Sequence, residues 1–185
     1  MDLFNYFSLE QWLLVPLYGV QGNRCECGIA SCTSPGKHPR LKAWHRRPVV
    51  EPGKARRWMG ARPSMNWGII LRPTGLIDVE YDTSEGEQTA TELLGDSLTV
   101  SWRSRRSIHR LYTLPPELHR LSLTVRAWRG LEIRTGTHWK ACQSVIPPST
   151  HYTGSRYAWL DGLSPLEVEV AVLPGELCGV LSAAG

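Results

Sequence analysis

One short segment alternates apolar and acidic residues, and this alternation limits the fold more than any other feature. Residues 76–82 read Leu-Ile-Asp-Val-Glu-Tyr-Asp. Successive side chains of a β-strand point to opposite faces, so the apolar and the acidic side chains separate. We therefore expect a strand over residues 76–81 that packs one face on a core and carries Asp78 and Glu80 on the other.

Short strand-like runs separated by turn residues make up much of the remaining chain. Further strands are predicted over residues 67–71, 98–102, 108–114, 121–126, 131–134 and 142–146. Capping and proline signals predict helices over about residues 9–15, 52–60, 84–94 and 164–172. Because strands outnumber helices and arrive largely as hairpins, the predicted fold class is α+β with a mostly antiparallel sheet.

The overall composition is that of an ordinary globular protein. The 185 residues are 42% hydrophobic and 21% charged, which excludes a wholly disordered chain, collagen and a coiled coil. No run approaches the roughly 18 apolar residues of a membrane span. Residues 1–5 lack the basic start of a secretory signal. We expect a single domain, residues 1–185, that is cytoplasmic and has no membrane partner.

The net charge of +4 is distributed unevenly. Residues 37–62 contain nine basic residues and one acid, residues 103–129 contain seven arginines and one acid, and residues 78–96 contain seven acids and no base. Basic surfaces that hold a polyanion, beside carboxylates that hold divalent cations, would give this pattern. Three solvated faces with segregated charges would give it too.

Two segments can supply carboxylates to one metal site. Asp78 and Glu80 repel each other on a shared face, and oxygen ligands of this kind suit Mg²⁺ or Mn²⁺. The alternative is an edge strand whose polar face lies in water. Glu132 stands between two apolar residues in the predicted strand 131–134. If the two strands are neighbours, Glu132 completes a site of three carboxylates.

Two further segments can supply contacts to phosphate or nucleotide. Arg105, Ser107 and His109 share one face of an extended segment, where a guanidinium, a hydroxyl and an imidazole can hold a phosphate group. His109 can instead be a structural residue of its strand. After Pro-Pro at 147–148, Ser149 and His151 are presented from a stiff loop, which could equally be an inert turn.

Three of the five cysteines lie within eight positions of one another, close to a histidine. Cys25, Cys27, Cys32 and His38 follow a C-x-C-x4-C-x5-H pattern in a loop rich in Gly, Ser and Pro. Three thiolates and an imidazole form a ligand set of tetrahedral zinc, which would be structural because all four ligands come from the protein. The alternatives are reduced free thiols or a Cys25–Cys32 bridge.

Taken in order, these segments resemble the N-terminal domain of bifunctional DNA primase/polymerases, the prim-pol branch of the archaeo-eukaryotic primase superfamily. The resemblance spans nearly the whole chain. The family's acid-x-acid motif matches Asp78-Val79-Glu80, its Ser-x-His motif matches Ser107-Ile108-His109, and its later single acid matches Glu132. The cysteine loop and the Pro-Pro-Ser-x-His-x-x-Gly stretch at 147–154 are also similar to the family's. In one departure, many members carry a Ser-Gly-Gly-x-His turn where this chain has Ser104-Arg105-Arg106-Ser107-Ile108-His109, so both glycines are missing.

The resemblance implies an archaeo-eukaryotic primase-type catalytic core in two parts. An N-terminal part would cover about residues 1–65, with its zinc loop at 24–39, and an RRM-like catalytic part would cover about residues 66–175. The implied reaction is template-dependent transfer of a nucleotide from an NTP or dNTP to a 3′-hydroxyl on single-stranded DNA, with two Mg²⁺ or Mn²⁺ ions on Asp78, Glu80 and Glu132.

The same resemblance assigns substrate contacts and partners. His109, Ser107 and Arg105 would bind the triphosphate and stabilise the charge that develops during transfer. Further nucleotide contacts are expected from Arg134, Gln143, Ser149 and His151. The two basic segments, 37–62 and 103–129, would follow the phosphates of template and primer, which predicts salt-dependent binding. Similar proteins often continue into a helicase, so a helicase domain or protein is a further expected partner.

Two other functions are compatible with these residues. The chain could be a non-catalytic nucleic-acid-binding replication module whose acids only shape its surface. It could also be a metal-dependent nuclease, which likewise clusters carboxylates, although the Ser-x-His pair disfavours this third function.

Overall fold

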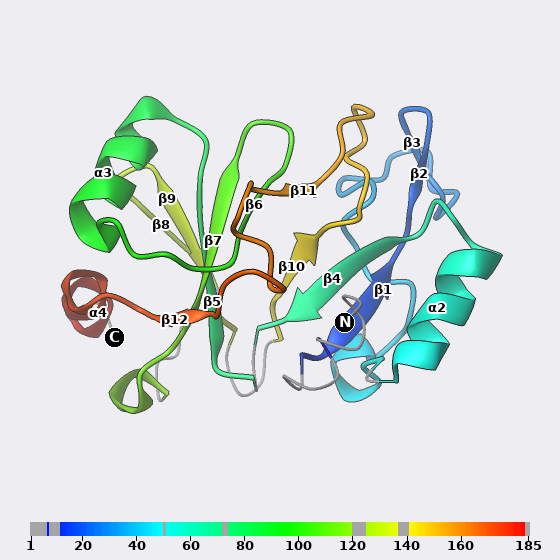
Figure 1. Ribbon diagram of the computed structural model, residues 1–185. Helices are drawn as coiled ribbons and strands as arrows, with labels where there is room; N and C mark the ends of the chain where they lie inside the picture. The colour runs from blue at the N-terminus through cyan, green and yellow to red at the C-terminus, as the bar shows by residue number, and fades with distance from the viewer. Residues whose placement is uncertain are drawn as a thin grey trace.

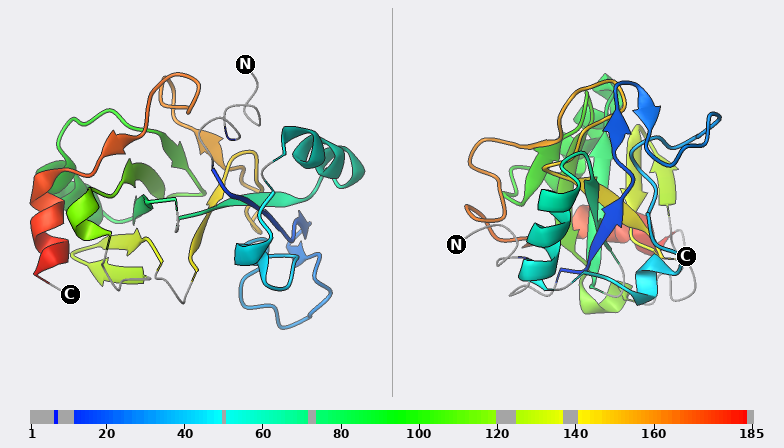
Figure 2. Two further views of the ribbon diagram at one scale, coloured as in Figure 1. Left: turned by 90° about the horizontal axis from the view of Figure 1, so that it is seen from below. Right: turned by 90° about the vertical axis from the view of Figure 1, so that its right-hand side faces the viewer.

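A computed structural model describes residues 7, 12–49, 51–71, 74–119, 125–136 and 141–183. Two sheets lie side by side, with helices α3 (Ser84–Leu94) and α4 (Gly175–Ser182) at one end of the molecule and helix α2 (Pro52–Ala61) at the other (Figure 1). The view from below in Figure 2 shows the same arrangement. The predicted α+β class with mostly antiparallel pairing is confirmed.

The smaller sheet has three strands, β1 (Leu14–Leu17), β4 (Asn66–Ile70) and β10 (Gln143–Ile146), with β4 in the centre. Both pairings are antiparallel. All five residues of β4 are buried, because β4 has a neighbouring strand on each side and a core beneath it. Helix α2 begins with proline at its first turn, as predicted, and contributes Ala55 to this core.

A loop-rich segment lies between β1 and α2. It contains the short hairpin of β2 (Val20–Gln21) and β3 (Arg24–Cys25), the cysteine loop, and the 3-10 helix η1 (Trp44–Arg46). Isolated bridges join Leu17 to Pro39 and Leu14 to Val49. The cysteine loop is therefore fastened along the outer edge of β1.

The larger sheet has the order β11-β6-β7-β5-β9-β8, and β12 adds to β7 as the parallel pairing. Its strands are β5 (Leu76–Tyr81), β6 (Ser101–Arg103), β7 (Ile108–Thr113), β8 (Val125–Trp128), β9 (Leu131–Arg134), β11 (Ala158–Trp159) and β12 (Ala171–Val172). The 3-10 helix η2 (Pro116–Leu118) follows β7.

The apolar and the acidic side chains of β5 lie on opposite faces of the strand, as their alternation in the sequence predicts. Ile77 and Val79 are fully buried in a core that they share with residues of α3 and α4. Asp78 and Glu80 lie on the opposite face, which is the face toward β10 of the smaller sheet. Helix α3 has the predicted bounds, but Thr83 caps it, because the Thr83 hydroxyl accepts the N–H of Gly86 at 3.1 Å.

The expected helix over residues 9–15 is wrong at its C-terminal end. Residues 8–11 lie outside the described ranges, and residues 14–17 form β1. A strand buried on both faces has the same continuous apolar sequence as a buried helix segment. Pro16, which was expected to stop the helix, fits within β1 because β1 is an edge strand and needs no second row of N–H donors.

The expected helix over residues 164–172 is also wrong. The backbone turns at Ser164, whose carbonyl accepts the N–H groups of Glu167 and Val168, and residues 171–172 then form β12. Valines alternate with other residues over 168–172, and β-branched residues favour an extended chain. The helix of this region is α4, farther along the chain.

Two other boundaries differ from the expectations. The strand expected over residues 121–126 is described only from Val125, where β8 begins, and residues 121–124 lie outside the described ranges. The smaller sheet combines β1 with two strands from beyond residue 65, so a boundary at that residue does not separate the two sheets. In the part of the chain that the structure describes, no helix is long and apolar enough to cross a membrane.

Candidate active site and metal centre

The three predicted carboxylates lie on one face of the larger sheet. Strand β5 pairs directly with β9, which places Glu80 opposite Glu132 and Asp78 opposite Arg134. Residues directly opposite in an antiparallel pair have adjacent side chains on the same face. Glu132 can complete the carboxylate site with Asp78 and Glu80 if the two strands are neighbours. The pairing of β5 with β9 meets this condition.

The guanidinium group of Arg134 lies among these carboxylates. Its Nη1 is 3.3 Å from Asp78 Oδ2 and also contacts Glu80, while its Nη2 donates to Glu132. Burial alone would lower the pKa of Arg134, but the three carboxylates raise it overall. Arg134 therefore stays charged and neutralises part of the acidic face.

Asp78 is fully buried and links the two sheets. Its carboxylate accepts hydrogen bonds from Ser144 of β10, from His109 Nδ1 at 3.0 Å, and from Arg134. Burial would raise the pKa of Asp78, but the charges of His109 and Arg134 and the hydrogen bonds from His109 and Ser144 lower it. Ser144 is a contact that the sequence did not indicate, because it comes from a strand 66 residues away.

His109 is held by contacts on two sides. Its Nδ1 faces Asp78, and its ring stacks on Trp102 with centroids 4.9 Å apart and planes 3° apart. A carboxylate only accepts hydrogen bonds, so Nδ1 carries the proton. The other nitrogen, Nε2, lies 3.9 Å from Glu80 Oε1. This arrangement fixes the ring and leaves Nε2 available to a ligand.

A pocket lies where the carboxylate face meets β10 and the cysteine loop. Its lining comes from both sheets and from three loops: Lys37, Glu80, Ser104, His109, Arg134, Gln143, Ser144, Val145 and Tyr157. The lining combines one carboxylate, Glu80, with the basic side chains of Lys37 and Arg134. Lys37 and Tyr157 were not singled out as site residues from the sequence, because only the packing of distant segments brings them here.

The predicted phosphate contacts lie around this pocket in different environments. Ser107 is buried and hydrogen-bonds to Glu80. Arg105 is exposed in the turn between β6 and β7. His151 is half-buried, and its pKa is lowered by burial and by the positive charges of Lys37 and Arg105. The charges of Lys37 and Arg105 thus act on His151 and favour its neutral form.

Gln143 and Ser149, both expected to contact nucleotide, have different places in the structure. Gln143 lines the pocket and donates from Nε2 to the backbone carbonyl of Lys37 at 2.9 Å. Ser149 is 1% exposed, and its hydroxyl accepts the N–H of Trp67 at 2.9 Å and donates to the carbonyl of Trp67 at 3.2 Å. The structure thus brings Gln143 to the pocket and uses Ser149 to join its loop to β4.

Replacing Ser149 with alanine is expected to lower the free energy of unfolding by about 1–3 kcal/mol, because it removes two buried hydrogen bonds to the backbone of Trp67. Nucleotide affinity should change by less than about twofold. Urea unfolding and nucleotide titration measure the two effects. Ser155→Ala, which removes a partly exposed hydroxyl of the same loop, is the control. A large loss of nucleotide affinity in a stable Ser149→Ala protein would show a direct contact instead.

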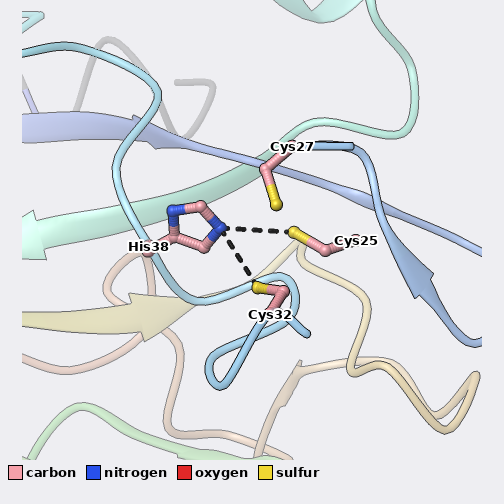
Figure 3. Close-up of side chains that lie close together, drawn as sticks. All are labelled: Cys25, Cys27, Cys32 and His38. Atoms are coloured by element: carbon pink, nitrogen blue, oxygen red, sulfur yellow. Dashed lines mark hydrogen bonds between the residues drawn. The ribbon is translucent and has the colours of Figure 1, made fainter. Parts of the chain in front are cut away.

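The four predicted zinc ligands converge in the cysteine loop (Figure 3). The ligand atoms of Cys25, Cys27, Cys32 and His38 all lie within 4.8 Å of one another. His38 Nε2 is 3.3 Å from the sulfur of Cys25 and 3.5 Å from that of Cys32. Three sulfurs and one imidazole nitrogen match the donors that zinc prefers, so this site can bind zinc. All five cysteines are free thiols, and the alternative Cys25–Cys32 bridge is not formed.

Local contacts favour the metal-binding forms of two of these ligands, Cys25 and His38. Burial raises the pKa of the Cys25 thiol, but backbone N–H groups of Gly36 and Cys27 lower it overall, which favours the thiolate. Burial lowers the pKa of His38, which favours the neutral imidazole that a metal needs. The His38 ring also packs on Tyr18, with centroids 4.7 Å apart.

Asn66 fastens the cysteine loop to the rest of the pocket. Its Nδ2 donates to the carbonyls of Gly36 and Thr150, both at 2.8 Å, and its Oδ1 accepts the N–H of Thr150 at 2.8 Å. The buried side chain of β4 thus holds the residue before Lys37 and the loop that carries His151. The sequence contains no local signal for this role, since the partners are 30 and 84 residues away.

Comparison with known proteins identifies the family. The family model described as "Bifunctional DNA primase/polymerase, N-terminal" matches residues 4–176, which is most of the chain. A search of curated proteins finds no match to this sequence. The family match agrees with the resemblance carried by the Asp-x-Glu, Ser-x-His and cysteine motifs. This chain belongs to the Prim-Pol family, the N-terminal domain of bifunctional DNA primase/polymerases.

Proposed function

We propose that this chain is a template-dependent DNA primase/polymerase domain that transfers a nucleotide from an NTP or dNTP to a 3′-hydroxyl on a single-stranded DNA template. Family membership supports the class of activity. The observation that carries the assignment of residues is one pocket whose lining includes Glu80, His109 and Arg134 of the larger sheet and Lys37 of the cysteine loop. A nucleotide triphosphate bound to divalent ions needs such neighbouring acidic and basic groups.

The acidic side of the pocket fits Mg²⁺ or Mn²⁺ by its donor chemistry. Asp78, Glu80 and Glu132 offer only carboxylate oxygens, the ligands that these ions prefer. They would hold the ions, which supply a lowered pKa at the attacking 3′-hydroxyl and charge neutralisation at the leaving pyrophosphate. Glu80 and Glu132 are partly exposed and directly opposite each other, whereas Asp78 is fully buried and accepts hydrogen bonds from Ser144, His109 and Arg134.

The basic groups in and around the pocket would bind and orient the triphosphate. His109 is fixed through Nδ1, so Nε2 can donate to a phosphate oxygen when the ring is protonated. Lys37, Arg105 and His151 add donors, and Gln143 holds the backbone of Lys37 in place. Groups fixed before the reaction stabilise the developing charge without reorganising.

We assign the larger sheet with α3 and α4 to the RRM-like catalytic part of the family's core. The smaller sheet, α2 and the cysteine loop form the second part, so the chain crosses between the parts more than once. This assignment is supported by the position of Asp78, Glu80, His109 and Glu132, which all lie on the larger sheet. Zinc in the cysteine loop would be structural.

The experiment is incorporation of a labelled nucleotide on single-stranded DNA with Mg²⁺ or Mn²⁺, with and without a primer. Divalent-dependent growth of the labelled product supports the proposal, and growth without a primer identifies a primase. Shortening of end-labelled DNA without nucleotides would indicate the nuclease. Binding of DNA with neither growth nor shortening would indicate the non-catalytic binding module.

A further inference from the structure

Arg134 contacts all three carboxylates that would hold divalent ions. Nη1 lies 3.3 Å from Asp78 and also contacts Glu80, and Nη2 contacts Glu132. Arg134 is two residues beyond Glu132 on β9, so both side chains project from the same face of the strand. A single guanidinium thus joins the acid-x-acid segment of β5 to the later acid on β9.

Burial reduces the screening of the ion pair between Arg134 and Asp78. The side chain of Arg134 is 19% exposed and that of Asp78 is fully buried, so water screens their attraction only weakly. The pair of Arg106 with Asp82, next to the same strand, differs in this respect because the Arg106 side chain is 74% exposed. An exposed pair of that kind contributes little, whereas a buried charge that loses its partner is costly.

Across the described ranges, the carboxylates that Arg134 contacts are not gathered as the ligand atoms of a metal site are. Among the described residues, the group whose ligand atoms come within 4.8 Å of one another is the cysteine cluster, and the three carboxylates do not form such a group. A divalent ion needs oxygen ligands at about 2.0–2.6 Å from its centre. The oxygens that Arg134 holds must therefore give up Arg134 before they can surround an ion.

We infer that Arg134 is a built-in counter-cation of the carboxylates, which a divalent ion must displace, and that the displaced guanidinium turns to the triphosphate. This inference rests on the proposed function. Arg134 lines the same pocket as Lys37 and His109, and a guanidinium pairs well with phosphate oxygens. The triphosphate thus binds the guanidinium that the divalent ion displaces. Binding of the ion and binding of the nucleotide therefore promote each other.

The test measures Mn²⁺ affinity by calorimetry on the zinc-loaded chain, with neither nucleotide nor DNA present. Arg134→Gln removes the counter-cation and is expected to bind Mn²⁺ at least about tenfold more tightly than the wild type, because the carboxylates lose a competing positive charge. Arg106→Gln removes an equal charge near the same strand and should change the affinity by less than about twofold. Unchanged or weaker Mn²⁺ binding by a folded Arg134→Gln protein would overturn the inference.

A second measurement does not depend on the folding of the Arg134→Gln protein. In the wild-type protein, the Nε–H signal of Arg134 in a ¹⁵N-correlated NMR spectrum should shift as Mg²⁺ is added. Arg134→Lys, which lacks this group, assigns the signal. Binding of Mg²⁺ without a response from Arg134 would contradict displacement. Since neither measurement contains a polymerase substrate, absence of polymerase activity and failure of this inference are distinguishable.

Discussion

Replacing Glu80 with glutamine is expected to reduce nucleotide incorporation by about a thousandfold or more while the protein stays folded and binds DNA. Glutamine keeps the shape of the side chain and its place opposite Glu132, but it removes the charge that would hold a divalent ion. Metal stabilisation of phosphoryl transfer contributes several kcal/mol, and each 1.36 kcal/mol is about tenfold in rate. Single-turnover incorporation and fluorescence anisotropy with labelled DNA measure the two properties.

A matched control is available on the same segment. Asp82→Asn makes the same change of charge two residues farther along, where the carboxylate pairs with the exposed Arg106 at 2.9 Å. Its incorporation rate should stay within about twofold of the wild type. Equal losses in both variants, or full activity of Glu80→Gln, would contradict the assignment of Glu80 as a metal ligand.

For structural reasons, a substitution of Glu80 tests the role of the metal ligands more clearly than a substitution of Asp78. From the sequence the two acids look equivalent, since both belong to one motif. In the structure, removal of the Asp78 carboxylate leaves Ser144, His109 and Arg134 without their buried partner. Breaking a buried pair in this way costs about 3–5 kcal/mol, so loss of folding would obscure loss of chemistry.

Replacing Cys27 with serine is expected to lower the zinc content from one ion per chain to almost none and to destabilise the protein. Structural zinc contributes folding free energy directly. Losing even about 3 kcal/mol would lower the melting temperature by about 6–12 °C for a chain of this size. Nucleotide binding should weaken as well, because Lys37 lies next to His38 and its carbonyl is held by Gln143. Elemental analysis, thermal unfolding and nucleotide titration check these effects.

Cys178→Ser is the control for this prediction. Cys178 lies in α4 and its sulfur donates to the carbonyl of Leu173 at 3.5 Å, away from the cysteine loop. This variant should retain its zinc and its nucleotide affinity. A Cys27→Ser protein that retains one zinc ion per chain, or that loses zinc with no change in stability, would show that the cluster is not a structural zinc site.

Local patterns were sufficient to predict part of this molecule. Alternation over residues 76–82 predicted which side chains lie on each face of β5. The four ligands of the cysteine cluster could be recognised in the sequence because one short loop supplies them all. Residues 14–15, at the start of β1, were predicted as the end of a helix, since a fully buried strand has no alternation to distinguish it. The fold class therefore followed from sequence better than the individual elements did.

The arrangement of the site depends on pairings between distant segments, which a single sequence does not specify. The register of β5 and β9 places Glu132 opposite Glu80, and β10 brings Ser144 to Asp78. Arg134 looked like a nucleotide contact from its motif, and only this register shows that it already binds the carboxylates. The sequence identified the chemistry of the residues, while their partners required the structure.

Whether the template selects the nucleotide is the question on which the proposed activity depends. The measurement is incorporation by the wild-type chain, with Mn²⁺ and a primer, on an oligo(dT) and an oligo(dC) template supplied with labelled dATP or dGTP. We expect dATP to be used on oligo(dT), dGTP on oligo(dC), and neither without a template. Equal use of both nucleotides on both templates, or no incorporation by a folded, zinc-loaded protein that binds the DNA, would contradict a template-dependent polymerase.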